Sequence, residues 1–137
     1  METNFHLSLP CLGIQRTKDF YGKLLGAKVG RNTNHWVDIN LYGNQITFTK
    51  SGDFNFAYKN YKFENSILPS FHFGIVMSLK EWNELFASLQ DKDVLFMDKT
   101  NFLQDKNGEH SSFFLKDPNG YIVEFKTFKD LKTIFIK

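Results

Sequence analysis

The sequence predicts an α+β protein in which one order of elements, a strand, a helix and then further strands, occurs twice. The pair Phe5-His6 recurs as Phe71-His72, and each pair opens an apolar, strand-like run. A helical pattern of apolar residues follows each run. A glycine-containing turn then precedes the last strand-like run of each half, at 42–44 and at 117–120.

The first half begins with an alternating run that we expect Pro10 to end. Thr17 is a suitable N-cap for a helix that Gly26 would stop. Two apolar runs around the 42–44 turn are typical of a hairpin. The expected elements are a strand at 5–9, a helix at 17–25 and strands at 28–31, 36–41 and 45–49.

The second half repeats this order. Ser78 is expected to cap a helix whose apolar residues recur at helical spacing, and Asp117-Pro118-Asn119-Gly120 has the composition of a tight turn. The helix carries Trp82, Leu85, Phe86 and Leu89, and strands are expected at 71–77, 94–96, 111–115 and 121–128.

A chain of 137 residues fits a single domain, 1–137. We divide it into module one (1–50), a linker (51–70) and module two (71–137). The linker is rich in Asn, Lys, Tyr and Phe and has no periodicity. It would serve either as a mobile flap or simply as the connection between the modules.

The 17 basic and 15 acidic residues are interspersed, which argues against the strong one-sign field of a nucleic-acid binder. Cys11, the only cysteine, allows no internal disulfide and is expected to be a small buried hydrophobe. We find neither an apolar signal region nor an apolar run long enough to span a membrane. We therefore expect a cytoplasmic protein, a homodimer, that binds a small-molecule substrate and neither nucleic acid nor membrane.

Two histidines and one carboxylate are the candidate metal ligands. His6 and His72 share a module position, and Glu124 lies in the last apolar run. Two neutral imidazoles and one carboxylate form the facial triad that binds a divalent ion and leaves positions open for substrate or oxygen. The alternatives are hydrogen-bonded or surface histidines, and a salt bridge between Glu124 and a buried Lys or Arg.

His35 and His110 are candidate proton-transfer residues, because imidazole titrates near neutral pH. His35 follows a turn-like Asn32-Thr33-Asn34 segment and is either a solvated loop residue or an acid or base at the edge of a cleft. His110 is either an exposed loop residue or a proton donor behind the metal ligands.

Three segments resemble one known family. They are 5–10 followed by 19–26, which carries F-Y-x-x-x-L-G; His72-Phe73-Gly74; and 113–125, which carries D-P-N-G-x-x-x-E-F. This combination resembles the vicinal oxygen chelate superfamily, which includes glyoxalase I, bleomycin-resistance proteins, fosfomycin-modifying enzymes and type I extradiol dioxygenases.

The resemblance implies two βαβββ modules that form an open, cupped mixed sheet with a metal-binding cleft. The most similar branch, small proteins described as predicted extradiol-type dioxygenases, has His, His and Glu as ligands, which correspond to His6, His72 and Glu124. We therefore expect an Fe(II)-dependent ring-cleaving dioxygenase acting on a small substrate with vicinal oxygens. Mn(II), Zn(II) or Ni(II) are the other candidate metals.

Two positions depart from the pattern of catechol-cleaving relatives. Phe114 stands where those enzymes have a tyrosine, and Asp105 where they have a histidine behind the ligands. Two alternative functions follow from the same resemblance. One is a glyoxalase-like isomerase or lyase, which normally has a fourth protein ligand where this chain has Thr47. The other is a metal-free ligand-binding protein of the bleomycin-resistance kind.

Overall fold

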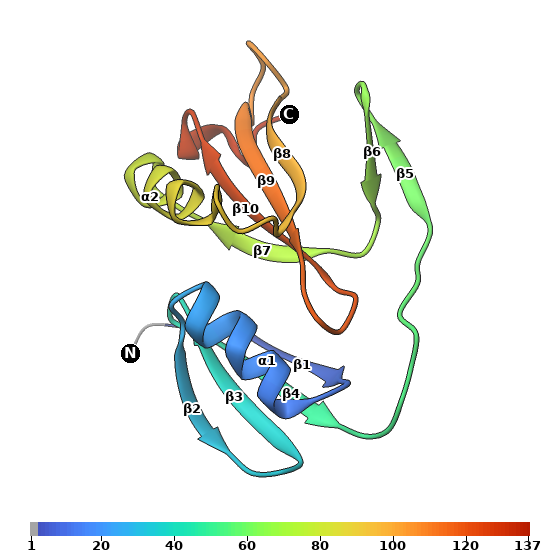
Figure 1. Ribbon diagram of the computed structural model, residues 1–137. Coiled ribbons are helices and arrows are strands. Elements are labelled where there is room, and N and C mark those ends of the chain that lie inside the picture. Colours follow the sequence, from blue (N-terminus) through green and yellow to red (C-terminus); the bar gives the residue numbers. More distant parts are fainter. Residues whose placement is uncertain (1–2) are drawn as a thin grey trace. The chain divides into compact units, whose positions relative to one another are not determined.

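The computed structural model describes residues 3–137, so residues 1–2 of module one lie outside it (Figure 1). The chain forms two compact units. Unit 1 contains the residues up to Phe56 together with Asp117–Gly120, and unit 2 contains Ala57–Lys116 and Tyr121–Lys137. Each unit has a four-stranded mixed sheet and a helical segment, which confirms the predicted α+β class.

Unit 1 has the strand order β1-β4-β3-β2, in which β1 is parallel to β4 and the other pairs are antiparallel. Tyr42 and Gly43 join β3 to β4, with φ of 52° and 87°. Two successive positive φ values are typical of the two-residue hairpin turn, whose twist matches that of the strands. The strands are β1 (His6–Cys11), β2 (Lys28–Asn32), β3 (Trp36–Leu41) and β4 (Asn44–Lys50).

The helical segment of unit 1 starts earlier than predicted. It consists of α1 (Ile14–Lys18) and a π-helix, η1 (Asp19–Leu24), and its N-cap is Gly13. The predicted N-cap, Thr17, instead lies inside α1, fully buried, and donates its hydroxyl hydrogen to the Gly13 carbonyl at 2.8 Å. Gly26 has a φ of 73° just after the segment, as expected of a stop.

Pro10 does not end β1, as the sequence pattern predicted; the strand continues to Cys11. β1 is an edge strand of its sheet, where a residue without an N–H group is tolerated. Cys11 is fully buried, as predicted, and this burial raises the pKa of its thiol, with the hydrogen bond from Thr17 opposing the shift.

The turn at Asp117–Gly120 packs within unit 1 through buried polar groups. The Tyr21 hydroxyl donates to Asp117 Oδ2 at 2.8 Å, and Asn119 Oδ1 accepts the Leu12 N–H at 2.8 Å. The Asn119 amide also donates to Thr17 Oγ1 at 3.3 Å. In this chain the D-P-N-G motif therefore holds the helical segment of unit 1, which the sequence pattern did not reveal.

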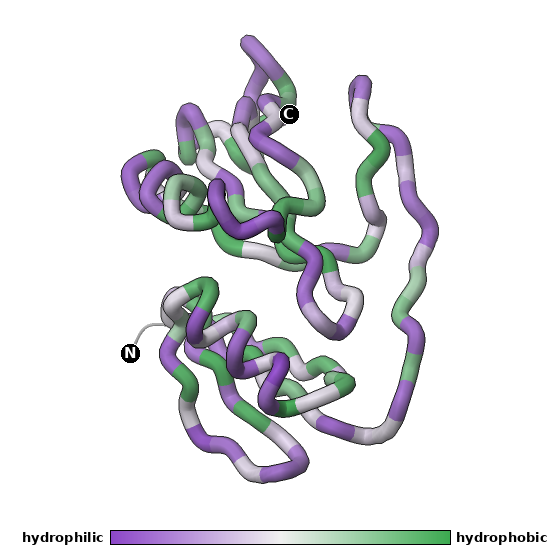
Figure 2. The backbone as a smooth tube through the Cα atoms, in the orientation of Figure 1, coloured by the Kyte–Doolittle hydropathy of each residue, from purple (hydrophilic) through white to green (hydrophobic). Residues whose placement is uncertain are grey.

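Unit 2 has the strand order β7-β10-β9-β8, the counterpart of the order in unit 1. Its helix, α2 (Leu79–Leu89), begins at the predicted N-cap Ser78, whose hydroxyl forms a capping box with Glu81. The four expected apolar residues of α2 are buried, and Figure 2 shows hydrophobic and hydrophilic segments succeeding each other along the helix. The strands are β7 (Phe73–Val76), β8 (Leu95–Phe102), β9 (His110–Lys116) and β10 (Ile122–Phe128).

Part of the predicted linker is a hairpin, β5 (Asn60–Phe63) with β6 (Ser66–Pro69). The sequence predicted no strand here, because most residues of the hairpin are exposed and the turn residue Glu64 has a φ of 53° without being glycine. Leu68 joins a buried cluster with Phe102, Phe114 and Ile122. The hairpin therefore covers part of one face of the unit 2 sheet.

The register of the two sheets confirms the internal repeat. In unit 1, β1 pairs with β4 so that Ser8 lies opposite Thr47; in unit 2, β7 pairs with β10 so that Gly74 lies opposite Glu124. Thr47 and Glu124 are thus equivalent positions, and His6 and His72 lie two residues before Ser8 and Gly74, respectively. Both units have the βαβββ order. That the two sheets form one cupped sheet with a cleft remains a prediction.

Candidate metal centre

His72 and Glu124 lie together on one face of the unit 2 sheet. The Nε2 atom of His72 is 3.2 Å from Oε2 of Glu124, whose residue is only 6% exposed. Two donor atoms bound to one ion at ordinary lengths stand about 3.0–3.4 Å apart in octahedral or tetrahedral geometry. The observed spacing therefore suits a shared metal ion as well as it suits a direct hydrogen bond.

The other imidazole nitrogen is held by backbone. His72 Nδ1 lies 2.8 Å from the carbonyl oxygen of Pro69, at the end of β6. A carbonyl can only accept, so Nδ1 carries the proton and the neutral ring keeps its lone pair on Nε2, facing Glu124. Metal-binding histidines are commonly oriented in this way. The β5–β6 hairpin thus positions a candidate ligand.

Two further side chains contact the Glu124 carboxylate. The buried hydroxyl of Ser112, on β9, donates to Oε1 at 2.7 Å. The ammonium of Lys126 lies 3.7 Å from Oε2. Ser112 therefore fixes one carboxylate oxygen and leaves the other directed at His72, while Lys126 adds a positive charge that would oppose a metal cation.

The pKa shifts follow from these contacts. Hydrogen bonding to Glu124 raises the pKa of His72, and burial of the ring opposes this only in part. Burial alone would raise the pKa of Glu124, but His72, Lys126 and Ser112 together outweigh it and lower that pKa. Without a metal, the two groups are an ion pair at mildly acidic pH.

Gly74 is required where β7 passes β10. A Cβ atom at this position would overlap the backbone carbonyl of Glu124, so only glycine allows the two strands to pair here. Gly74, the glycine of the His72-Phe73-Gly74 segment, therefore allows β7, which follows His72, to pair with β10, which carries Glu124.

His6, the third predicted ligand, belongs to unit 1. It is exposed at the start of β1 and pairs in register with Gln45. Thr47, the counterpart of Glu124, does not supply a carboxylate but donates its hydroxyl to Asp38 Oδ1 at 2.7 Å. The structure therefore brings His72 and Glu124 together, and the participation of His6 remains a prediction.

Of the two predicted proton-transfer residues, His110 belongs to unit 2 and lies apart from this pair. His110 is on the same sheet face as Glu124 but four residues along from Phe114, roughly 13 Å at strand spacing. Its Nδ1 atom is 2.8 Å from the Gly108 carbonyl, and its ring packs between Phe102 and Phe128. His35 is an exposed loop residue of unit 1.

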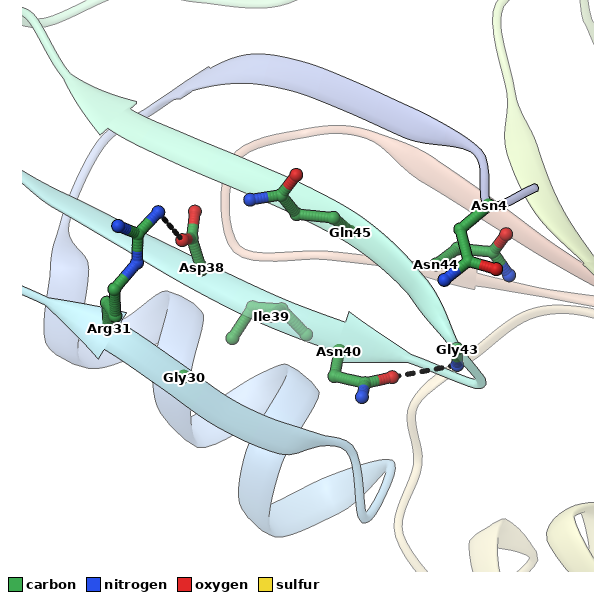
Figure 3. Close-up of a pocket in the computed structure, with 9 residues that line it drawn as sticks. All are labelled: Asn4, Gly30, Arg31, Asp38, Ile39, Asn40, Gly43, Asn44 and Gln45. Atoms are coloured by element: carbon green, nitrogen blue, oxygen red, sulfur yellow. Dashed lines mark hydrogen bonds and ion pairs between the residues drawn. The ribbon is translucent and has the colours of Figure 1, made fainter. Parts of the chain in front are cut away.

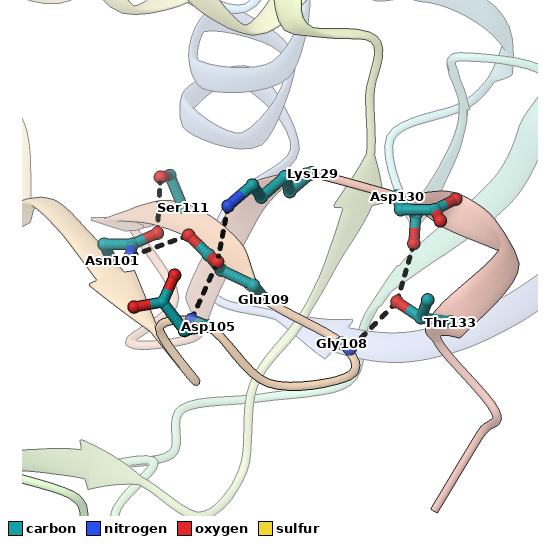
Figure 4. A network of polar contacts seen from close by, with 8 residues as sticks. All are labelled: Asn101, Asp105, Gly108, Glu109, Ser111, Lys129, Asp130 and Thr133. Atoms are coloured by element: carbon teal, nitrogen blue, oxygen red, sulfur yellow. Dashed lines mark hydrogen bonds and ion pairs between the residues drawn. The ribbon is translucent and has the colours of Figure 1, made fainter.

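The two departures from the catechol-cleaving pattern differ in their surroundings. Phe114 packs its ring edge-on against His72, with centroids 5.7 Å apart, and forms an apolar wall beside the imidazole. Asp105 is exposed in a loop, where its N–H donates to Glu109 Oε1 at 2.9 Å (Figure 4). Lys129 completes this network with an ion pair to Glu109 at 3.1 Å. Glu109 and its partners hold the loop and the C-terminal segment.

Sequence reasoning missed Ser112, Lys126 and Pro69 as partners of the candidate ligands. Lys126 is two residues after Glu124 and therefore on the same strand face, a signal that the pattern offered. Ser112 and Pro69 are adjacent only through strand register and through the hairpin, neither of which the sequence predicted in that detail.

Comparisons with known proteins define the class. The family model of the glyoxalase/bleomycin resistance protein/dioxygenase superfamily matches residues 5–125, so the chain belongs to this superfamily. No curated protein matches it.

Three solved structures show the same fold. A glyoxalase/bleomycin resistance protein/dioxygenase from Alicyclobacillus acidocaldarius is similar with a TM-score of 0.82 at 24% identity, covering 98% of this chain and 97% of that one. The fosfomycin resistance protein FosX from Listeria monocytogenes has a TM-score of 0.69 at 12% identity, covering 98% and 99%. A glyoxalase/dioxygenase from Nostoc punctiforme has a TM-score of 0.67 at 12% identity, covering 94% and 92%.

Within either unit of residues 3–137, no three His, Cys, Asp or Glu side chains gather closely enough to hold a metal ion. None of the helices in this range is long and apolar enough to cross a membrane.

Proposed function

We propose that the protein is a mononuclear metal enzyme in which His6, His72 and Glu124 bind Fe(II), with Mn(II), Zn(II) or Ni(II) as the alternative ions. The reaction we propose is extradiol-type dioxygenation of a small substrate with vicinal oxygens. A bound ion would supply Lewis-acid activation of a substrate that chelates it through two oxygens, with a lowered pKa of the substrate hydroxyls, and redox chemistry toward oxygen.

The observation that supports this proposal most is the geometry of His72. Its lone pair on Nε2 is directed at a buried carboxylate oxygen, 3.2 Å away, by the Pro69 carbonyl. The buried carboxylate contacts Ser112, His72 and Lys126, and its Oε2 atom is the one that faces the imidazole. The repeat offers a second imidazole, His6, at the equivalent position of the other module, and with it the set would have two histidines and one carboxylate.

The chain's own residues would prepare the site as follows. Ser112 holds Oε1 of Glu124 and leaves Oε2 available for the ion. Phe114 and the cluster under the hairpin keep water away from one side of the imidazole, which strengthens electrostatic interactions there. Lys126 would favour an anionic form of the chelating substrate.

Thr47 argues against the glyoxalase-like alternative. That reaction class normally uses a fourth protein ligand at the position of Thr47, whose hydroxyl donates to Asp38.

We further propose that the protein is cytoplasmic, because a buried free thiol and a ferrous site both suit a reducing compartment. We propose a homodimer, because superfamily members often form dimers. Sedimentation velocity of the metal-loaded protein tests the dimer.

Oxygen consumption tests the proposed reaction. Protein purified without oxygen and loaded with Fe(II) should consume oxygen with a member of a panel of catechols and hydroxyquinols, in stoichiometric amount with ring-opened product. We expect weak turnover of unsubstituted catechol, because Phe114 cannot donate a hydrogen bond and acid-base help is typically worth about 10² to 10⁴ in rate. A panel that yields no ring-opened product from the Fe(II)-loaded protein contradicts the reaction.

His110 and His35 are the proposed proton-transfer residues. Replacing the responsible one by alanine should lower kcat on the true substrate without loss of metal. Full activity in both His110→Ala and His35→Ala would remove both from the mechanism.

A further inference from the structure

Unit 1 contains a second polar site, a hollow of about 350 Å³ on the face of its sheet that carries His6 (Figure 3). Strands β2, β3 and β4 line it, and Gly30 contributes no side chain to its wall. The lining residues are Asn4, Gly30, Arg31, Asp38, Ile39, Asn40, Gly43, Asn44 and Gln45.

Asp38 is the buried charge of this hollow. It is 9% exposed, and two groups contact its carboxylate: Thr47 Oγ1 donates to Oδ1 at 2.7 Å, and an Arg31 guanidinium nitrogen donates to Oδ2 at 3.2 Å. The hydrogen bond from Thr47, followed by those from Arg31 and Gln45, lowers the pKa of Asp38 despite its burial. Asp38 is therefore a buried anion with a hydrogen-bond donor on each carboxylate oxygen.

Arg31 is positioned by Asp38 and still has N–H donors available to a ligand. Only one terminal nitrogen contacts Asp38, and its side chain remains 80% exposed. The guanidinium carbon lies 5.6 Å from the centre of the Trp36 ring. A guanidinium has five N–H donors in a fixed fork, so a positioned Arg31 still presents donors to a ligand.

The neighbouring amide also offers donors. Asn40 Oδ1 accepts the Gly43 N–H at 2.7 Å. Its NH₂ group has no hydrogen-bond acceptor among the described residues and can donate to a ligand. Lys28 pairs with Asn40 across the strands, so it stands on the same face. The ionised residues Lys28, Arg31 and Asp38 together give this face one net positive charge.

We propose that this hollow binds the carboxylate group of a small organic acid, with Arg31 as the ion-pairing residue, Asn40 as a second donor and Asp38 as the residue that positions Arg31. A planar carboxylate matches the guanidinium fork, and one negative charge neutralises the face. A neutral polyol would leave the positive charge unpaired.

The position of the hollow connects it to the proposed metal site. Gln45, on its wall, is the register partner of His6. On the proposed function, the substrate would therefore be an acid that carries both a carboxylate and vicinal oxygens. Only this identification as substrate rests on the proposed function; the binding of a carboxylate does not.

The test is a titration of the full-length protein, as purified and again after chelator treatment, with benzoate and with its neutral analogue benzamide. Binding is followed by the NMR signal of the Trp36 indole N–H, one of two tryptophans, assigned with Trp36→Phe. We expect benzoate to shift the signal saturably, with or without metal, and benzamide to leave it unchanged.

Variants separate the charge from the shape. Arg31→Gln should weaken benzoate at least about tenfold, because a charge-assisted bond is lost, and Arg31→Lys should bind with intermediate affinity. Asp38→Asn, which removes the contact that positions Arg31, should weaken benzoate binding, and Gly30→Val should block it by filling the hollow. Arg16→Gln, which removes an exposed arginine of α1, is the matched control and should bind like the parent.

Equal benzoate affinity in the parent and in Arg31→Gln would overturn the proposal, as would equal shifts by benzoate and benzamide. A protein that binds benzoate through Arg31 but no metal would keep this inference and refute the proposed function. With an active Fe(II) enzyme, a kcat/KM for 3,4-dihydroxybenzoate above that for catechol, abolished in Arg31→Gln, supports the acid as substrate; equal values contradict it.

Discussion

The Nε2 atom of His72 lies 3.2 Å from Oε2 of Glu124, and each side chain is oriented by a further contact on its far side. Pro69 accepts from the imidazole, and Ser112 donates to the carboxylate. Both candidate ligands are thus fixed before any ion binds, which lowers the cost of ordering them.

The ion pair predicts a specific pH dependence for the metal-free protein. The raised pKa of His72 contributes stability that is fully present below its ordinary value of 6.5 and is lost as pH rises through the raised value. The lowered pKa of Glu124 contributes stability present above 4.5 and lost as pH falls through the lowered value.

The contribution of the pair is therefore greatest between those two ordinary values. In urea unfolding with chelator present, the parent should exceed His72→Gln in unfolding free energy most at about pH 5.5, with a smaller difference at about pH 8.5. A difference that increases with pH would show that the pair does not carry the charges assigned to it.

Ser112 and Lys126 should affect metal affinity in opposite directions. Ser112→Ala frees one carboxylate oxygen and should weaken metal binding about 10–100-fold, the usual effect of losing a ligand's orienting partner. Lys126→Gln removes a repelling cation and should tighten binding. Competition titration with a metal indicator measures both, and Lys129→Gln, whose partner is Glu109, is the control. Weaker binding in Lys126→Gln would refute the electrostatic account.

Gly74→Ala should damage unit 2 severely. The new methyl group has no space beside the Glu124 carbonyl, so β7 must move from β10 at a cost above about 3 kcal/mol. Gly30→Ala, whose Cβ would meet only ordinary contacts, should cost less than about 1 kcal/mol. Urea unfolding compares them, and similar stabilities would contradict the strand pairing described for β7 and β10.

Asn119 predicts a purely structural effect. Asn119→Ala leaves the Leu12 N–H without its acceptor and should cost about 1–3 kcal/mol of stability. Metal content should not change, because the turn supplies no ligand. The control is Asn107→Ala, an exposed amide bonded to the Lys137 carbonyl, for which the expected cost is below about 0.5 kcal/mol. Loss of metal from a folded Asn119→Ala protein would contradict this assignment.

Local signals in the sequence sufficed for much of the fold. The capping box at Ser78 and the helical spacing of its apolar residues predicted α2, and the 42–44 turn predicted the β3–β4 hairpin. Where tertiary contacts determine the ends of an element, the predicted bounds were incomplete. The predicted strand at 94–96 extends to Phe102, because an edge strand can continue through the polar segment that follows.

The same division holds for the candidate site. The repeat predicted His72 as a ligand, and the apolar context predicted Glu124. In the structure, Nε2 of His72 lies 3.2 Å from Oε2 of Glu124. The contacts of Arg31 with Asp38 and of Ser112 with Glu124 depend on which residues face each other across strands. Register is set by the packing of a whole face, so composition and spacing alone could not supply those pairs.

The metal content of protein purified without oxygen tests the central claim most directly. The parent should hold one divalent ion per chain by mass spectrometry, whereas His6→Ala, His72→Ala and Glu124→Gln should hold almost none while keeping the circular dichroism of the parent. Glu109→Gln, which removes a carboxylate elsewhere in unit 2, should retain the ion. Equal metal content in the parent and the three ligand variants would contradict the assignment of His6, His72 and Glu124 as the metal site.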